Sequence, residues 1–114
     1  MMKAKSRNAR VTKKTIAAMV RCIVRRFHPE KVILFGSCAR GDAGSDSDVD
    51  LMVVMPVSGS KLDKIVEIRG ILDSFRVPKD VIVVTPDEFD DYADIIGTIV
   101  RPAVKEGKLL YARS

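Results

Sequence analysis

The chain has 114 residues, of which 46% are hydrophobic and 31% are charged, and its formal net charge is +5. These values are typical of one globular domain with a core of its own. No apolar run approaches the ~20 residues that span a bilayer, and the basic N-terminus lacks the apolar segment of a signal peptide. The sequence therefore argues against an integral membrane protein and predicts a cytoplasmic location.

Positive charge is concentrated at the N-terminus. Residues 1–29 contain nine basic and no acidic residues, whereas residues 30–114 carry a net negative charge. We interpret residues 1–11 as a basic disordered tail and residues 12–114 as one folded domain. A basic tail can attract RNA or an acidic partner. Because solvated tails are common, a nucleic-acid role is possible here but is not favoured.

The first expected element is an amphipathic helix over residues 12–27. Apolar residues recur there at steps of three and four and form one stripe. They are Ile16, Met19, Val20, Ile23, Val24 and Phe27. The helix is expected to end at His28, because the residue before a proline, here Pro29, is disfavoured in the α region.

Two apolar, β-branched runs, residues 31–35 and 51–55, predict buried strands on either side of a polar loop. Asp48 and Asp50 stand two residues apart where the second strand begins, so both carboxylates should point to one face. Neighbouring carboxylates repel each other and favour a cation between them. Because the cluster holds only oxygen ligands, we expect Mg²⁺ or Mn²⁺.

The other end of this loop is suited to phosphate. Gly36 allows the backbone to approach an anion, and the Ser37 hydroxyl with the N–H groups of a short helical turn can bind phosphate. The two cysteines, Cys22 and Cys38, form neither a disulfide framework nor a metal motif, and we interpret them as reduced thiols. Cys38 follows Ser37 directly, so it could be sensitive to alkylation.

The second half of the chain predicts a crossover and a last edge strand. The expected elements are a helix over 61–75, a strand over 81–84, a helix from Pro86 and an edge strand over 108–111. Thr85 and Glu88 predict a capping box at the start of the later helix. Gly97 and Pro102 are expected to interrupt that helix. The strand over 81–84 is continuously apolar and is expected to be covered on both faces.

The loop motif resembles that of the minimal nucleotidyltransferases of the DNA polymerase β superfamily, the MNT type. The match consists of Gly36-Ser37, ten intervening residues, and Asp48-Val49-Asp50, with Ala39-Arg40-Gly41-Asp42 and Ser47-Asp48-Val49-Asp50-Leu51 also following the family pattern. The family carries a third metal carboxylate at the start of a later strand, and Asp80 supplies it here. The implied fold is α+β, in the order α-β-α-β-α-β-α, with a small mixed sheet flanked by helices.

This resemblance implies an Mg-dependent nucleotidyltransferase that uses ATP. Asp48, Asp50 and Asp80 would be the catalytic residues and would hold two Mg²⁺ ions. The implied nucleotide-binding residues are Gly36, Ser37, Arg40 and Ser47. Asp80 would also help to deprotonate the acceptor hydroxyl. The chain resembles antitoxins that transfer AMP to a tyrosine of a HEPN toxin, and we expect that role because no acceptor-binding domain accompanies the core.

Two other functions stay open at this stage. The same fold could neutralise a toxin by binding alone, with the nucleotide site vestigial, although three intact carboxylates argue against decay. The chain could also transfer nucleotides to RNA or to a small molecule, for which the basic N-terminal residues are the supporting feature. The sequence leaves the acceptor, the base of the nucleotide and the oligomeric state undetermined.

Overall fold

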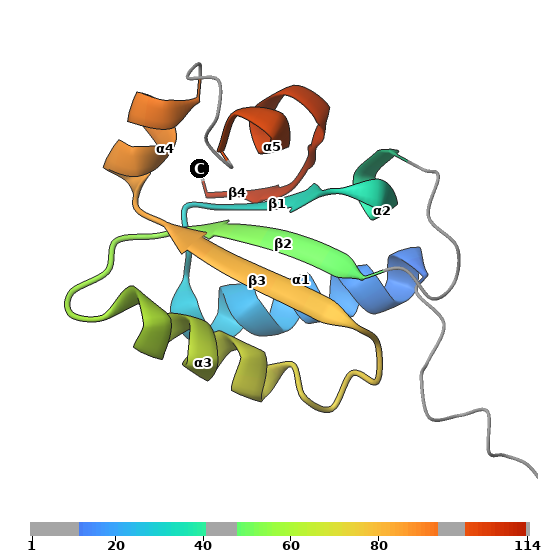
Figure 1. The fold of residues 1–114 in the computed structure, drawn as a ribbon. Helices are drawn as coiled ribbons and strands as arrows, with labels where there is room; N and C mark the ends of the chain where they lie inside the picture. Colours follow the sequence, from blue (N-terminus) through green and yellow to red (C-terminus); the bar gives the residue numbers. More distant parts are fainter. Residues whose placement is uncertain (1–11, 41–47, 94–99, 114) are drawn as a thin grey trace, which may run out of the picture.

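The structure is a computed structural model that describes residues 12–40, 48–93 and 100–113. Four strands form one mixed sheet, and helices cover both of its faces (Figure 1). In chain order the elements are α1 (Lys13–Phe27), β1 (Lys31–Phe35), α2 (Ser37–Arg40), β2 (Val49–Val54), α3 (Lys61–Ile71), β3 (Lys79–Val84), α4 (Pro86–Tyr92), α5 (Val100–Glu106) and β4 (Lys108–Ala112). The predicted α+β class is confirmed. The predicted basic tail, residues 1–11, lies outside the described residues.

The strands lie in the order β3-β2-β1-β4. β1 is antiparallel to both β2 and β4, whereas β2 and β3 are parallel. A parallel pair needs a crossover connection, and α3 provides it. Among the described strands β4 pairs with β1 alone, so the last strand is an edge strand as the sequence predicted.

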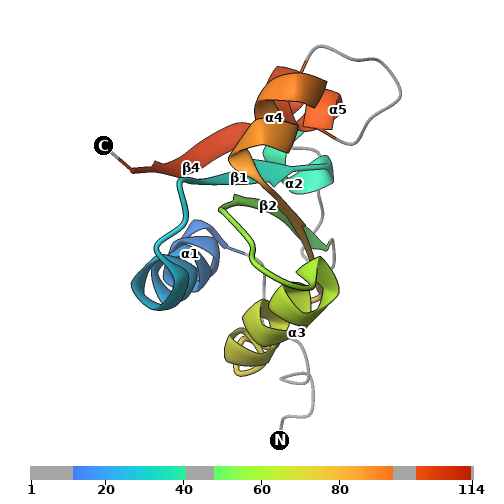
Figure 2. The same ribbon diagram turned by 90° about the vertical axis from the view of Figure 1, so that its left-hand side faces the viewer.

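The sheet has a core on each face. Figure 2 shows α1 and α3 on one side of the sheet and α4 and α5 on the other. Leu51 and Val53 of β2 pack in the larger core with α1 and α3, whereas Met52 and Val54 pack in the smaller core with α5. β2 is therefore buried on both faces, which explains its continuous apolar run.

The first helix begins and ends where the sequence predicted. The side chain of Thr12 caps α1 by accepting a hydrogen bond from the N–H of Thr15 at 3.1 Å. The predicted apolar stripe is buried at Ile16, Met19, Val20 and Ile23. His28 ends the helix in the left-handed conformation, with φ of +51°, and its N–H donates to the carbonyl of Val24.

The start of α4 confirms the predicted capping box. The Glu88 N–H donates to the Thr85 hydroxyl at 3.2 Å, and the Glu88 carboxylate accepts from the Thr85 N–H at 2.9 Å. The prediction that Pro102 interrupts this helix was wrong. α4 ends earlier, at Tyr92, and Pro102 lies in the first turn of α5, where a missing N–H breaks no intrahelical bond. Gly97 lies outside the described residues.

Within the described parts of the chain, none of the helices is both long enough and apolar enough to cross a membrane.

Candidate active site

Three chain segments meet at one edge of the sheet. β1 ends at Phe35, while β2 and β3 begin at Val49 and Lys79. Because β1 is antiparallel to β2 and β2 is parallel to β3, these ends lie together, beside α2 (Figure 1). The edge thus collects the glycine after β1 and the aspartates at the start of β2 and β3. The sequence motif and the later aspartate, far apart along the chain, become one site.

Asp50 and Asp80 are register partners in the parallel pair of β2 and β3. Register partners on adjacent parallel strands point to the same face, with the strands about 4.8 Å apart. That face is the one covered by α4 and α5, since Asp50 alternates with Leu51 and shares its side with Met52. Asp48 is exposed just before β2. The structure therefore places Asp50 beside Asp80, with Asp48 two residues before Asp50.

The electrostatics of Asp50 reflect its neighbours. Burial raises the pKa of its carboxyl, and the negative charges of Asp80 and then Asp48 raise it further. Asp50 is half-buried, whereas the other two carboxylates are exposed. A cation bound here would offset the repulsion between these three carboxylates and favour the ionised form of Asp50.

The donor chemistry fits a hard divalent ion, because the candidate ligands are all carboxylate oxygens. Among the residues that the structure describes, no three such side chains already converge as ligands on one point. Asp80 instead pairs with Arg69 of α3 at the outer strand of the sheet, with 3.5 Å between its Oδ1 and the Arg69 Nη1. The predicted metal role of these aspartates stays a prediction, and binding would require Asp80 to leave this ion pair.

Gly36 has a specific reason to be glycine. Its φ is +74°, and a Cβ built on it would lie 2.3 Å from the Oδ2 of Asp50. The sequence predicted that this glycine lets the backbone approach an anion, and the carboxylate of Asp50 is the anion found there. Its predicted contact with phosphate stays a prediction.

The other predicted nucleotide-binding residues are described only in part. The backbone of Ser37 and Arg40 forms the short helix α2, so a helical turn does follow Gly36. The side chains of Ser37 and Arg40, and all of Ser47, lie outside the described residues.

Cys38 connects α2 to the aspartates. Its Sγ donates to the carbonyl oxygen of Asp48 at 3.2 Å. Burial, then the charges of Asp50 and Asp48, raise the pKa of the thiol. A raised pKa keeps a thiol protonated and less nucleophilic, so the contact is structural and gives no support to sensitivity toward alkylation.

Sequence reasoning missed Arg69 at this site. Within the helix predicted over 61–75, the structure buries Ile68 and directs the next residue, Arg69, to Asp80. Arg69 and Asp80 lie on different elements, and no spacing in the sequence marks the pair.

Solved structures of similar fold include a proposed nucleotidyltransferase and two toxin–antitoxin structures. A proposed nucleotidyltransferase from Sulfolobus solfataricus is 27% identical, with a TM-score of 0.60 over 88% of this chain and 79% of that chain. A toxin–antitoxin structure with AMP-PNP is 18% identical, with a TM-score of 0.59 over 85% and 73%. A mutant of the toxin–antitoxin MntA–HpeT is 14% identical, with a TM-score of 0.60 over 90% and 75%. For the last two structures, the similarity to this chain is one of fold alone.

No curated protein matches the chain in sequence. The family model of the nucleotidyltransferase domain matches residues 16–109, which include every described strand of the sheet at least in part. The matched range also contains Gly36, the aspartates at the strand ends and the loop between them. The chain belongs to the nucleotidyltransferase domain family.

Proposed function

We propose that this chain transfers AMP from ATP to a hydroxyl group of a partner protein, a tyrosine of a HEPN toxin, and so acts as an antitoxin. The observation that carries the proposal is the pairing of Asp50 with Asp80 in register, with Asp48 close enough to raise the pKa of Asp50. This is an arrangement of carboxylates suited to metal-assisted transfer of a nucleotide.

The comparisons with solved structures support the proposal that the partner is a toxin and that the AMP donor is ATP. Two proteins of similar fold are components of toxin–antitoxin pairs, and one of these structures contains AMP-PNP, an analogue of ATP. The chain also covers 73% and 75% of these two neighbours, so the likeness in fold extends over most of each of them. The antitoxin role, the HEPN identity and ATP itself are our proposals for this chain.

Each carboxylate has a role that follows from its position. Asp48, just before β2, and Asp50, the register partner of Asp80 in the ladder of β2 with β3, would hold Mg²⁺ together with Asp80. When bound, Mg²⁺ supplies positive charge that polarises the α-phosphate and neutralises the leaving pyrophosphate. Gly36, Ser37, Arg40 and Ser47 would orient the triphosphate. The protein contributes positioning and electrostatics, since none of the proposed roles requires a covalent nucleophile.

Asp80 is the candidate base for the acceptor. It lies on the edge strand β3 and is exposed, so an acceptor hydroxyl can reach it from solvent. The hydroxyl oxygen would bond to the α-phosphorus as its proton passes to Asp80, and the bond between the α-phosphorus and the oxygen bridging to the β-phosphate would break. Pyrophosphate leaves, and the acceptor keeps AMP.

The test is the intact mass of the protein encoded next to this chain, after incubation with this chain and Mg-ATP. We expect increments of the size of AMP. The Asp48→Asn variant should lose them, whereas Asp90→Asn, the same change at an exposed position on α4, should keep them. Modification that persists in Asp48→Asn would contradict the metal mechanism.

The same experiment separates the alternatives. A stable complex without increments would favour an antitoxin that acts by binding alone. Neither complex nor increments would redirect the search for an acceptor to RNA and small molecules.

A further inference from the structure

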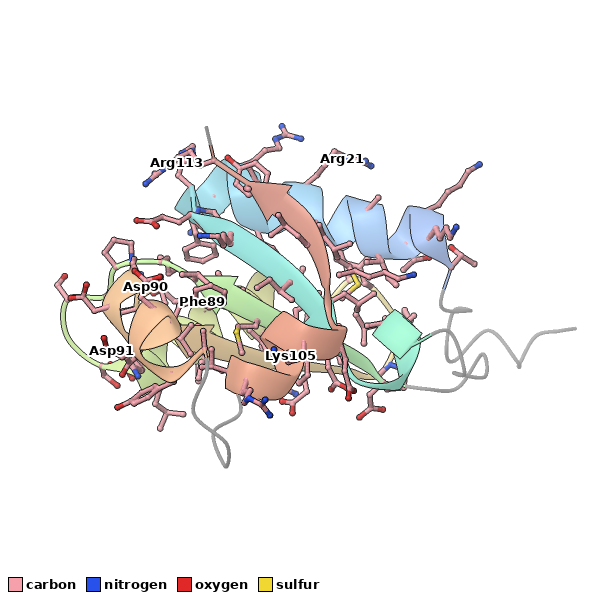
Figure 3. All side chains as sticks on the ribbon, turned by 90° about the horizontal axis from the view of Figure 1, so that it is seen from above. Arg21, Phe89, Asp90, Asp91, Lys105 and Arg113 are labelled. Carbon is pink, nitrogen blue, oxygen red and sulfur yellow. The ribbon has the colours of Figure 1, made fainter. Side chains whose placement is uncertain are left out.

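A groove of about 750 Å³ runs between α1 and β4, and its described lining includes none of the aspartates of the candidate site. Its floor is apolar and includes Val20, Val24, Leu34 and Leu110. Leu34 and Val20 belong to the larger core, so the groove lies on the face of the sheet that α1 covers. In the view from above, β4 crosses beside α1, which carries Arg21 (Figure 3).

The walls of this groove are basic. Lys13, Arg21, Arg25 and Lys108 line it, and the described residues of the lining include no acid. Within the described residues, none of these four cations forms an ion pair with a carboxylate. The acidic residues Asp90 and Asp91 lie on α4, well away from α1 in Figure 3. An apolar floor under unpaired cations is complementary to a ligand that is both apolar and negatively charged.

We propose that this groove binds an acidic amphipathic helix of the partner protein. α1 borders the groove from Lys13 to Arg25, a length of about 18 Å at ~1.5 Å per residue, which suits a helix of about three turns. Such a helix would place its apolar side on the floor and its carboxylates against the four cations. The inference rests on the proposed function only in taking the partner to be the acceptor protein.

Other occupants match the groove less well. The chain's own residues 1–11 are basic and would be repelled by the walls. Among the described helices, a second copy could offer α4 as an acidic one, and the apolar Phe89 of α4 already packs in the smaller core. RNA would gain from the cations, but the described part of the lining holds one aromatic residue, Tyr111, which gives its bases little to stack on.

The position of the groove separates docking from chemistry. Neither Asp50 nor Asp80 is among the described residues that line the groove, so a helix bound there need not cover them. Cys38 links the two regions, because it lines the groove and also contacts the backbone of Asp48. A partner anchored there is held beside the sheet edge that carries the aspartates.

Charge reversal tests the proposal on the complex of this chain with the protein encoded next to it. The groove variant is Arg21→Glu with Arg25→Glu, and its control is Lys14→Glu with Arg26→Glu. All four side chains are exposed on α1, but only the first pair lines the groove. We expect the dissociation constant to rise at least about tenfold more in the groove variant than in the control. Equal weakening by both variants, or no complex with the wild-type chain, would overturn the proposal.

Photo-crosslinking identifies the occupant. A benzophenone amino acid in place of Ala17, an exposed residue of the lining, should crosslink to an acidic amphipathic segment of the partner. The same probe in place of Val66, which is 61% exposed on α3, is the control and should give no such product. Crosslinks from the Ala17 position to a second copy or to RNA, or to the partner only from position 66, would overturn the proposal.

The two proposals can fail separately. If the Ala17 probe reaches the partner but the partner gains no AMP, the docking inference stands and the proposed transfer fails. If the groove variant binds and modifies the partner as well as the wild type does, the transfer stands and the docking inference fails.

Discussion

The backbone of Gly36 and the carboxylate of Asp50 lie so close that no larger side chain fits at position 36. A Cβ there would stand 2.3 Å from the Asp50 Oδ2, and the φ of +74° is one that other residues rarely adopt. Gly36 follows β1 and Asp50 belongs to its antiparallel neighbour β2. The glycine thus determines where a candidate metal ligand can sit.

We predict that Gly36→Ala costs about 1–2 kcal/mol of stability from the left-handed backbone and, in addition, displaces the carboxylate of Asp50. Mn²⁺ affinity, followed by electron paramagnetic resonance, should fall at least about tenfold, and AMP transfer should fall with it.

Gly59→Ala is the matched control, since Gly59 also has a positive φ, of +97°, but its Cβ would meet no atom within 4 Å. It should lose stability in urea unfolding and keep its Mn²⁺ affinity. Equal Mn²⁺ affinity in the two variants would show that the contact between Gly36 and Asp50 does not position the ligand.

The raised pKa of Asp50 predicts a cost in stability when no cation is bound. The folded state holds the proton more tightly than the unfolded chain does. Protonated Asp50 therefore contributes its full share to the stability of the folded state below the ordinary pKa of an aspartate. This contribution is lost as the pH rises through the raised pKa. Asp50→Asn cannot ionise, so in the presence of a chelator at pH 7 it should melt at a higher temperature than the wild type.

This advantage should shrink as the pH falls below the usual titration range of aspartate, and also when Mg²⁺ is added to the wild type. Thermal unfolding by circular dichroism measures both effects. A lower melting temperature for Asp50→Asn at pH 7 with chelator would mean that the carboxylate stabilises the metal-free fold.

The order of the elements could be predicted because each has a local cause. The apolar stripe of α1, the β-branched runs of β1 and β2, and the capping box of α4 act within a few residues of sequence. The first residues of the strands were harder to predict from the sequence. β2 begins at Val49 and β3 at Lys79, each two residues before the predicted strand, since backbone pairing in the parallel ladder extends past Asp50 and Asp80 whatever their polarity.

The site was predictable only where it follows a motif. The prediction that Asp48 and Asp50 share a face used the two-residue period of a strand, although β2 begins only at Val49, and Asp80 came from the family resemblance. Arg69 reaches Asp80 only through the packing of α3 beside β3, which no local pattern specifies. The groove between α1 and β4 depends on how a helix and a strand from opposite ends of the domain lie together.

The ion pair between Arg69 and Asp80 predicts competition with a metal ion. Arg69→Gln would free the Asp80 carboxylate and remove a nearby positive charge, so Mn²⁺ affinity should rise. The gain should be modest, up to about fivefold, because both side chains are about half-exposed and such pairs contribute ~0.2–1 kcal/mol. Lys64→Gln is the control on the same helix, since Lys64 pairs with Glu67 at 3.1 Å. Weaker Mn²⁺ binding by Arg69→Gln would show that Arg69 supports the metal site.

Glu88 connects two helices that flank the sheet on opposite faces. Its carboxylate accepts from the Thr85 N–H within the capping box and pairs with Lys61, in the first turn of α3, at 2.5 Å. The hydrogen bond from Lys61, followed by that from Thr85, lowers the pKa of Glu88. The resulting stability is present above the ordinary pKa of a glutamate and is lost as the pH falls through the lowered value.

Two substitutions separate these contacts. Glu88→Gln keeps an acceptor for the Thr85 N–H but loses the ion pair with Lys61, so it should cost at most about 1 kcal/mol. Glu88→Ala loses both and should cost about 1–2 kcal/mol. Urea unfolding at pH 7 and at pH 3 measures the difference. Both variants should approach the wild type at the lower pH, because there the wild-type carboxyl also begins to lose its charge. A Glu88→Gln variant less stable than Glu88→Ala would contradict this division of the two contacts.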